Sequence, residues 1–197
     1  MLNAYARTLS DRLVTPIARL LVRARLTPNV LTTAGLLGTL AGVALVLAGS
    51  RILGATVLAA GLILDAFDGA VARESGRVTA VGSFYDSVAD RVGDLVIFGA
   101  LVWLVQPSAL GFAVGMTALA AALLTSYVRA KAESLGFAAT VGLVERAERL
   151  GIVVLALWFD LVEPALWLLA VGGLITVVQR IVVVVGQARA QDREGGA

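Results

Sequence analysis

The chain of 197 residues contains no cysteine and no histidine. The first absence excludes disulfide bonds and thiolate metal sites. The second removes the commonest general base, the usual zinc ligand and the side chain that titrates near neutral pH. Any acid–base or metal chemistry therefore depends on carboxylates, lysines, tyrosines or water.

Charged residues are also scarce, since Asp, Glu, Lys and Arg together make up only 15% of the chain. Hydrophobic residues account for 59%, and the mean hydropathy is +0.91. A soluble domain normally has about 25% charged residues. A soluble helical bundle would also need polar outer faces on its helices, and long stretches of this sequence have none. We therefore expect an all-α polytopic membrane protein.

The hydrophobic runs predict six transmembrane helices, because a spanning helix needs about 20 mainly apolar residues. Their approximate positions are residues 28–49, 52–72, 82–105, 109–135, 150–161 and 164–185. The transmembrane domain would thus occupy residues 27–188, and a polar tail would follow over 189–197. In residues 1–26, leucines recur at helical spacing with arginines between them, which predicts an amphipathic juxtamembrane helix. A nucleic-acid-binding arm is disfavoured because base-stacking aromatics are not interleaved with these arginines, and we expect no nucleic-acid partner.

The distribution of basic residues tests the span count. With six spans and an internal N-terminus, every one of the 16 Lys and Arg residues except Arg51 falls on one side. The positive-inside rule assigns that side to the cytoplasm. We therefore expect a multi-pass protein of the cell (plasma) membrane with both termini in the cytoplasm.

Acidic residues gather where the second and third runs approach each other. Asp65 and Asp68 are three apart near the end of one run, and Asp86 and Asp90 are four apart near the start of the next. Each spacing puts both carboxylates on one helical face. A turn through Gly76 would fold the two helices antiparallel and bring the four carboxylates together near the cytoplasmic face.

Four carboxylates at such a site repel each other unless they are protonated or held by divalent cations. Each charged side chain within a membrane helix also costs about 2.5–3.5 kcal/mol on insertion scales. Oxygen ligands suit Mg²⁺, Mn²⁺ or Ca²⁺, so a metal site is the favoured interpretation. A hydrogen-bonded helix clasp, a proton relay and a small cation-binding membrane transporter are the alternatives. Transport sites usually lie at the membrane midplane, whereas these acids lie near one membrane face, which disfavours the transporter.

The spacing of these acids also carries a resemblance. The string Asp65-x2-Asp68-Gly69-x2-Ala72-Arg73-x8-Gly82-x3-Asp86-x3-Asp90 resembles the motif of the CDP-alcohol phosphatidyltransferase family, with eight specified identities in 26 residues. The resemblance implies a homodimeric enzyme that moves a phosphatidyl group from CDP-diacylglycerol to a polar alcohol at a cytoplasmic active site in residues 27–188.

The same resemblance implies roles for individual residues. Asp65, Asp68 and Asp86 would hold one Mg²⁺ ion, and Asp65, Asp86 and Asp90 a second, with Mn²⁺ as a possible substitute. Asp90 would also be the general base. The residues implied in CDP-diacylglycerol binding are Asn29, Val30, Leu31, Thr32, Gly69, Arg73 and Thr79.

A second polar cluster bears on the acceptor alcohol. It comprises residues 125–133, residues 145–149 and Arg180. Basic side chains at membrane ends ordinarily extend to the lipid head groups, but Arg180 lies inside an apolar run and should face a polar cavity. These segments resemble the actinobacterial phosphatidylinositol phosphate synthases within the family. That resemblance implies inositol 1-phosphate as the acceptor, with Ser126, Arg146 and Arg180 at its phosphate. The alternative is a phosphatidylglycerophosphate synthase that uses glycerol 3-phosphate.

Overall fold

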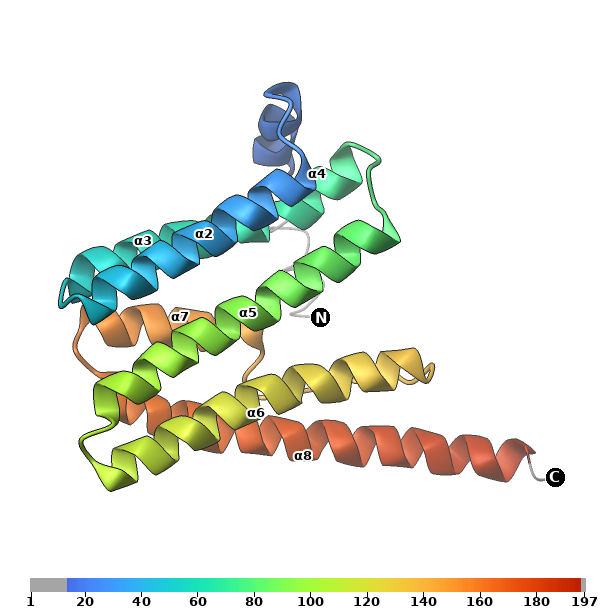
Figure 1. The fold of residues 1–197 in the computed structure, drawn as a ribbon. Helices are drawn as coiled ribbons and strands as arrows, with labels where there is room; N and C mark the ends of the chain where they lie inside the picture. Colours follow the sequence, from blue (N-terminus) through green and yellow to red (C-terminus); the bar gives the residue numbers. More distant parts are fainter. Residues whose placement is uncertain (1–13, 196–197) are drawn as a thin grey trace. The chain divides into compact units, whose positions relative to one another are not determined.

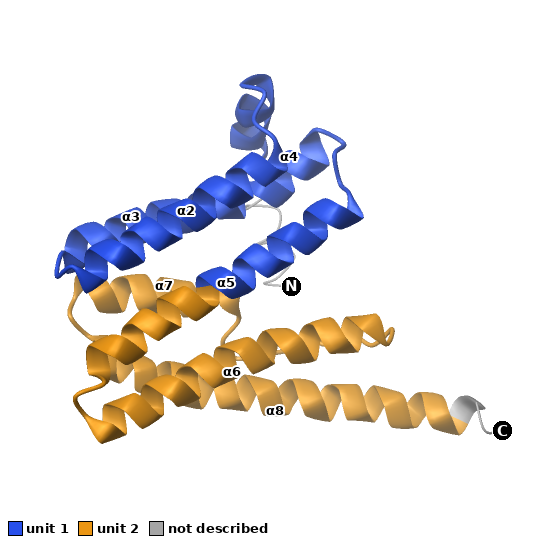
Figure 2. Cartoon of the chain, in the orientation of Figure 1, with its two compact units in different colours: residues 1–93 blue, residues 94–197 orange. Residues whose placement is uncertain are grey.

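The structure is a computed structural model that describes residues 14–195. Its secondary structure over this range is entirely helical (Figure 1), which confirms the all-α prediction. The helices are α2 (Pro28–Leu47), α3 (Arg51–Ala66), α4 (Asp68–Glu74), α5 (Ala80–Val105), α6 (Ala109–Ser134), α7 (Arg146–Trp158) and α8 (Val162–Gly195). The chain divides into two compact units, residues 1–93 and 94–197, and the boundary falls inside α5 (Figure 2).

The first unit is organised around the antiparallel pair α2 and α3. Helix α2 begins at Pro28, and the side chain of Thr27 caps it by accepting a hydrogen bond from the backbone N–H of Val30. The two helices pack with their backbones almost touching. A Cβ atom added to Gly42 would lie 2.6 Å from the backbone nitrogen of Leu58. Small residues permit this close approach, as is common between membrane helices.

A break at Phe67 separates α3 from α4. The backbone N–H of Phe67 donates to the carbonyl of Leu64 at 3.2 Å, a tightened turn of the 3₁₀ type. The sequence predicted a spanning segment over about residues 52–72, and the stretch Arg51–Glu74 keeps the length and hydropathy of a span across this break. Helix α4 ends at Glu74, and Gly76, two residues later with a φ of 65°, allows the chain to turn towards α5. The predicted turn through Gly76 is confirmed.

The segment before α2 is helical over residues 14–23. Its buried Ala18 packs with Leu31 of α2 and with Ala70 and Val71 of α4. Residues 1–13 of the predicted amphipathic helix lie outside the described residues. The surface role of that helix therefore stays a prediction.

In the second unit, α6 and α7 both pack against α8. The segment between α6 and α7 has no helix of its own, and side chains of α8 hold its backbone. The N–H groups of Leu143 and Val144 both donate to Thr176 Oγ1 at 3.1 Å. Further along α8, the amide of Gln187 both donates to and accepts from the backbone of Ala138.

Helix α8 extends further than the sequence predicted. We expected a polar tail over residues 189–197, but the helix continues to Gly195. Arg189, Ala190 and Gln191 have high helix propensity, so the helix can continue after its apolar part ends.

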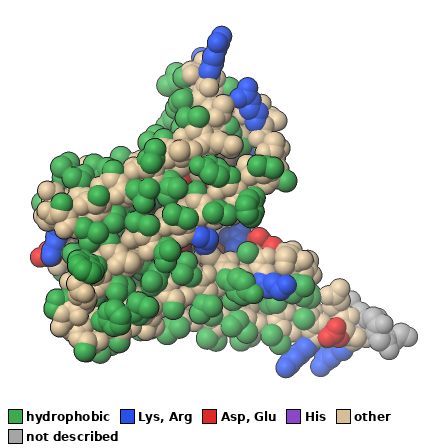
Figure 3. All heavy atoms as spheres, in the orientation of Figure 1, with side chains coloured by type: hydrophobic (Ala, Val, Ile, Leu, Met, Phe, Trp, Pro, Cys, Tyr) green, Lys and Arg blue, Asp and Glu red, His purple; other side chains and the backbone are tan. Residues whose placement is uncertain are grey.

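Four helical stretches in the described range are long and apolar enough to cross a membrane: Pro28–Leu47, Arg51–Glu74, Ala109–Ser134 and Val162–Arg193. Helix α5 has 26 residues but carries several charges, and α7 has only 13 residues, a length of about 20 Å. The predicted six spans are therefore not confirmed. Hydrophobic side chains are spread over the visible face of the helices (Figure 3), as expected for a protein that contacts lipid.

Candidate active site

Three carboxylates from three helices form a cluster in the first unit. Asp65 belongs to the last turn of α3, Asp68 begins α4, and Asp86 lies in the second turn of α5. One oxygen from each of the three lies within 4.8 Å of the other two, and Asp68 is buried. Three carboxylate oxygens at this spacing could hold a divalent cation, because Mg²⁺ and similar ions prefer oxygen ligands. The cluster contains three of the four predicted metal ligands.

The fourth predicted ligand, Asp90, lies one helical turn after Asp86 on α5. It is not part of the three-carboxylate cluster. Its Oδ2 atom lies 3.4 Å from the guanidinium of Arg91, the next residue in the chain.

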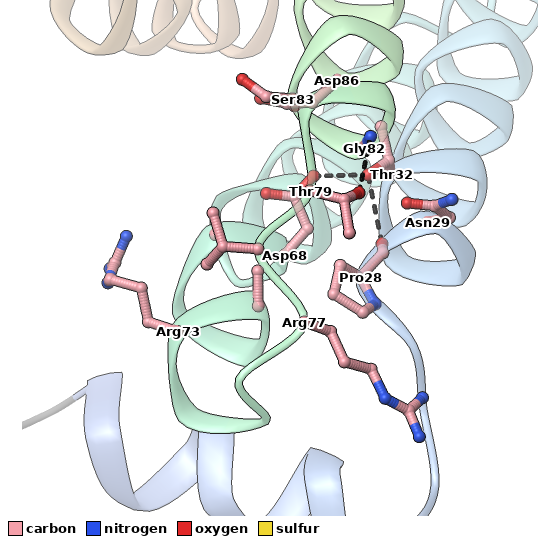
Figure 4. Close-up of a pocket in the computed structure, with 13 residues that line it drawn as sticks. Pro28, Asn29, Thr32, Asp68, Arg73, Arg77, Thr79, Gly82, Ser83 and Asp86 are labelled. Carbon is pink, nitrogen blue, oxygen red and sulfur yellow. Dashed lines mark hydrogen bonds between the residues drawn. The ribbon is translucent and has the colours of Figure 1, made fainter.

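Thr32 supports the cluster from α2. Its hydroxyl donates a hydrogen bond of 2.5 Å to Asp68 Oδ2, and both side chains are buried (Figure 4). A hydrogen bond to a metal-binding carboxylate fixes its orientation and is part of how proteins tune such sites. The sequence placed Thr32 in the nucleotide pocket but did not predict this second contact.

A pocket of about 300 Å³ adjoins Asp68 and Asp86 (Figure 4). Its lining comes from α2, α4, the turn after α4 and the start of α5. The lining residues are Pro28, Asn29, Thr32, Asp68, Gly69, Ala72, Arg73, Arg77, Val78, Thr79, Gly82, Ser83 and Asp86. Five of the seven residues predicted to bind CDP-diacylglycerol are among them. Of the other two, Val30 is exposed and Leu31 is buried in the core.

The absence of a side chain at Gly69 keeps part of this pocket open. A Cβ atom at that position would contact only Arg73 Nη1, at 3.5 Å. The glycine is thus not required for packing within the chain, and its predicted contact with a ligand stays a prediction.

Arg77 is a pocket residue that the sequence reasoning missed. The backbone N–H of Arg77 donates to the carbonyl of Ala72 at 3.0 Å, while that of Gly76 donates to Arg73 at 3.3 Å. These two bonds form a Schellman motif. The motif fixes the start of the Arg77 side chain beside the pocket. A glycine just after a helix, followed by an arginine, is the signal that could have identified it.

The predicted acceptor residues all lie in the second unit. The hydroxyl of Ser126 donates to the carbonyl of Ala122 within α6. Arg146 begins α7 and is partly exposed. Arg180 is buried in α8, where it donates to two backbone carbonyls, that of Val141 at 2.8 Å and that of Thr125 at 2.7 Å. Arg180 thus connects α8 to the backbone of α6 and of the segment before α7, a structural role that the sequence did not predict.

Comparison with known proteins identifies the family. The family model described as CDP-alcohol phosphatidyltransferase matches residues 25–185. The chain belongs to this family. The match covers both the carboxylate cluster and its pocket, together with the predicted acceptor residues.

Curated relatives cover most of the chain. It is 39% identical to the phosphatidylinositol phosphate synthase of Streptomyces avermitilis, over 93% of this chain and 82% of the relative. It is also 39% identical to the archaetidylinositol phosphate synthase of Methanothermobacter thermautotrophicus, over 93% of this chain and 94% of the relative.

Crystal structures of the phosphatidylinositol phosphate synthase of Mycobacterium tuberculosis share the fold. The structure with bound CDP-diacylglycerol has a TM-score of 0.75 and 36% identity, and the match covers 88% of this chain and 94% of that one. The structure of the same enzyme with manganese and citrate has a TM-score of 0.73 and 36% identity, with coverage of 87% and 88%.

Proposed function

We propose that the chain transfers the phosphatidyl group from CDP-diacylglycerol to inositol 1-phosphate, giving phosphatidylinositol phosphate and CMP. The observation that carries this proposal is the cluster of Asp65, Asp68 and Asp86 beside a pocket lined by Gly69 and Arg73. The names of the relatives support the choice of acceptor, because those at 39% identity include synthases of both phosphatidylinositol phosphate and archaetidylinositol phosphate.

The metal requirement follows from the donor set. Asp65, Asp68 and Asp86 would hold one Mg²⁺ ion, and Asp90 would join Asp65 and Asp86 around a second, with Mn²⁺ as a substitute. The manganese complex of the tuberculosis enzyme supports this proposal. When bound, such ions neutralise the charge of the diphosphate and of the departing CMP.

The residues of the pocket would bind and orient the nucleotide. Arg73 offers a guanidinium to the diphosphate, and Gly69 leaves room for the nucleotide beside it. Asn29, Thr32 and Thr79 supply hydrogen-bonding side chains for the rest of the CDP group.

The chemical step is an in-line displacement. The acceptor's hydroxyl oxygen forms a bond to the phosphorus that bears diacylglycerol, and the bond from that phosphorus to CMP breaks. The hydroxyl proton moves to Asp90, because a carboxylate is the available base in a chain without histidine. Ser126, Arg146 and Arg180 would bind the phosphate of the acceptor, for which guanidinium groups are well suited.

An acceptor assay on the purified full-length protein tests the reaction. CDP-diacylglycerol is supplied with inositol 1-phosphate, glycerol 3-phosphate or free inositol, and CMP release is measured. We expect release with inositol 1-phosphate and a lipid product of the corresponding mass. Release with glycerol 3-phosphate alone would instead identify a phosphatidylglycerophosphate synthase, and release with free inositol alone would refute a phosphorylated acceptor.

Metal removal provides a second test. EDTA should stop CMP release, and added Mg²⁺ or Mn²⁺ should restore it. Undiminished turnover in excess EDTA would contradict the proposed role of the carboxylate cluster.

We further propose six spans, with both termini and the active site in the cytoplasm, and assembly as a homodimer in the plasma membrane. The lack of cysteine makes the topology testable, because single cysteines can be introduced at Ser108 and Ser134 and labelled with an impermeant maleimide. Six spans expose Ser108→Cys outside and keep Ser134→Cys inside. If only the four stretches with clear spanning character crossed the membrane, the two results would be exchanged. Ser50→Cys is the control, since either count places it outside.

A further inference from the structure

Helix α5 carries a buried acid to which the family motif gives no role. Asp94 lies one helical turn after Asp90, where the motif ends, and its side chain has an exposed fraction of 0%. A carboxylate removed from water is costly unless charged partners and hydrogen bonds compensate. The contacts of Asp94 therefore indicate why it is tolerated.

Two arginines of α7 approach the two oxygens of this carboxylate. Arg149 Nη2 donates a hydrogen bond to Asp94 Oδ2 at 2.8 Å. Arg146 Nε lies 3.6 Å from Asp94 Oδ1. The two arginines are three residues apart and so share one face of α7. One carboxylate thus pairs with both guanidinium groups.

The two arginines differ in what else they can reach. Arg149 is 4% exposed and its guanidinium lies 6.0 Å from the centre of the Phe98 ring, so it is enclosed by protein. Arg146 is 30% exposed and is the first residue of α7. The N-terminus of a helix favours anions. Arg146 is therefore the member of the pair that can contact an anionic ligand.

The net charge of Asp94, Arg146 and Arg149 also favours an anionic ligand at Arg146. When ionised, one carboxylate and two guanidinium groups leave a net positive charge beside the exposed edge of Arg146. A phosphate group at that edge would compensate it. Asp94 would then do two things at once, since it compensates the enclosed Arg149 and limits the orientations open to Arg146.

We propose that Asp94 is a positioning residue for the phosphorylated acceptor, and that it acts by fixing the guanidinium of Arg146. The inference rests on the proposed function, because it takes Arg146 to be a ligand of the acceptor phosphate. Asp94 itself does not touch substrate. A pair that only joined α5 to α7 would affect the stability of the protein without affecting the KM for one substrate in particular.

The test is a double-mutant cycle on the purified full-length protein, with the KM for inositol 1-phosphate and for CDP-diacylglycerol measured separately. Asp94→Asn should raise the KM for inositol 1-phosphate about tenfold or more, because the neutral amide no longer forms the ion pair that orients the guanidinium of Arg146. The KM of this variant for CDP-diacylglycerol should stay within about twofold of the wild-type value. In an Arg146→Ala background, Asp94→Asn should change the KM for inositol 1-phosphate by no more than about twofold. Glu148→Gln is the matched control, since it removes an exposed acid from the same helix, and it should change neither KM.

Equal increases in both KM values would overturn the inference. It would also be overturned if the KM for inositol 1-phosphate in the double variant rose by the product of the two single-variant effects, since the two residues would then act independently. If Asp94→Asn does not fold, Asp94→Glu replaces it in the cycle. This variant keeps the charge but displaces it by one methylene, so it should also raise only the acceptor KM. A wild-type protein that releases no CMP with any phosphorylated acceptor would refute the proposed function and this inference together. Wild-type turnover without coupling in the cycle would refute the inference alone.

Discussion

Replacing Thr32 with valine removes one hydroxyl beside the carboxylate cluster and puts a methyl group of similar size in its place. The hydroxyl donates a hydrogen bond of 2.5 Å to Asp68 Oδ2, and both groups are buried, so water does not substitute for it freely. A hydrogen bond to a charged group contributes about 1.5–3 kcal/mol. Loss of a hydrogen bond that orients a metal ligand typically lowers metal affinity by about 10–100-fold. We therefore expect Thr32→Val to raise the Mg²⁺ concentration for half-maximal activity by at least about tenfold.

The measurement is CMP release against free Mg²⁺, supported by Mn²⁺ binding followed by electron paramagnetic resonance. Thr117→Val is the matched control, because it removes a helical hydroxyl that donates to the carbonyl of Ala113 in α6 and lies outside the pocket. A Thr32→Val protein with wild-type Mg²⁺ dependence and a raised KM for CDP-diacylglycerol would refute the reasoning. In that case the hydroxyl would serve the nucleotide and not the orientation of Asp68.

Three further substitutions, one of them with a control variant, separate chemistry, packing and substrate binding. Asp90→Asn should leave the thermal unfolding of the protein unchanged and abolish CMP release; a variant that retains most of its turnover would exclude Asp90 as the base. Gly42→Ala should lower the free energy of unfolding by about 1–3 kcal/mol, because the new Cβ would lie 2.6 Å from the backbone of Leu58. Gly99→Ala, whose Cβ would meet nothing within 4 Å, should not destabilise the protein in the same thermal assay. Gly69→Ala should also keep its stability but raise the KM for CDP-diacylglycerol, since its methyl group would enter the pocket; an unchanged KM would show that the nucleotide lies elsewhere.

The carboxylate cluster could be predicted from the sequence because helical spacing and one turn determine most of its geometry. Residues three or four apart share a helical face, and the glycine at position 76 allows the reversal between the two acidic segments. The break at Phe67 was not predictable in this way. Asp65, Asp68 and Gly69 around it have low helix propensity, but propensity alone does not locate a break of one residue, which the structure shows as a backbone hydrogen bond from Phe67 to Leu64.

The nucleotide pocket shows why a continuous sequence segment does not translate into a continuous set of pocket residues. Asn29, Val30, Leu31 and Thr32 were predicted to bind together, but they form the first turn of α2. Successive residues of a helix point about 100° apart, so one pocket receives residues three or four apart and not four in a row. Asn29 and Thr32 line the pocket, as this geometry requires. Leu31 instead packs in the core.

Arg180 illustrates how far the cost of a buried charge can guide prediction. An arginine within an apolar helix needs polar partners, and for this reason the sequence predicted a polar cavity around Arg180. The structure supplies two of them as backbone carbonyls, those of Val141 and Thr125. Val141 belongs to the segment that leads to Arg146, and Thr125 is the residue before Ser126, so Arg180 connects the two segments that carry the other predicted acceptor residues. A side chain with this role should influence acceptor binding even where its own guanidinium never meets the phosphate.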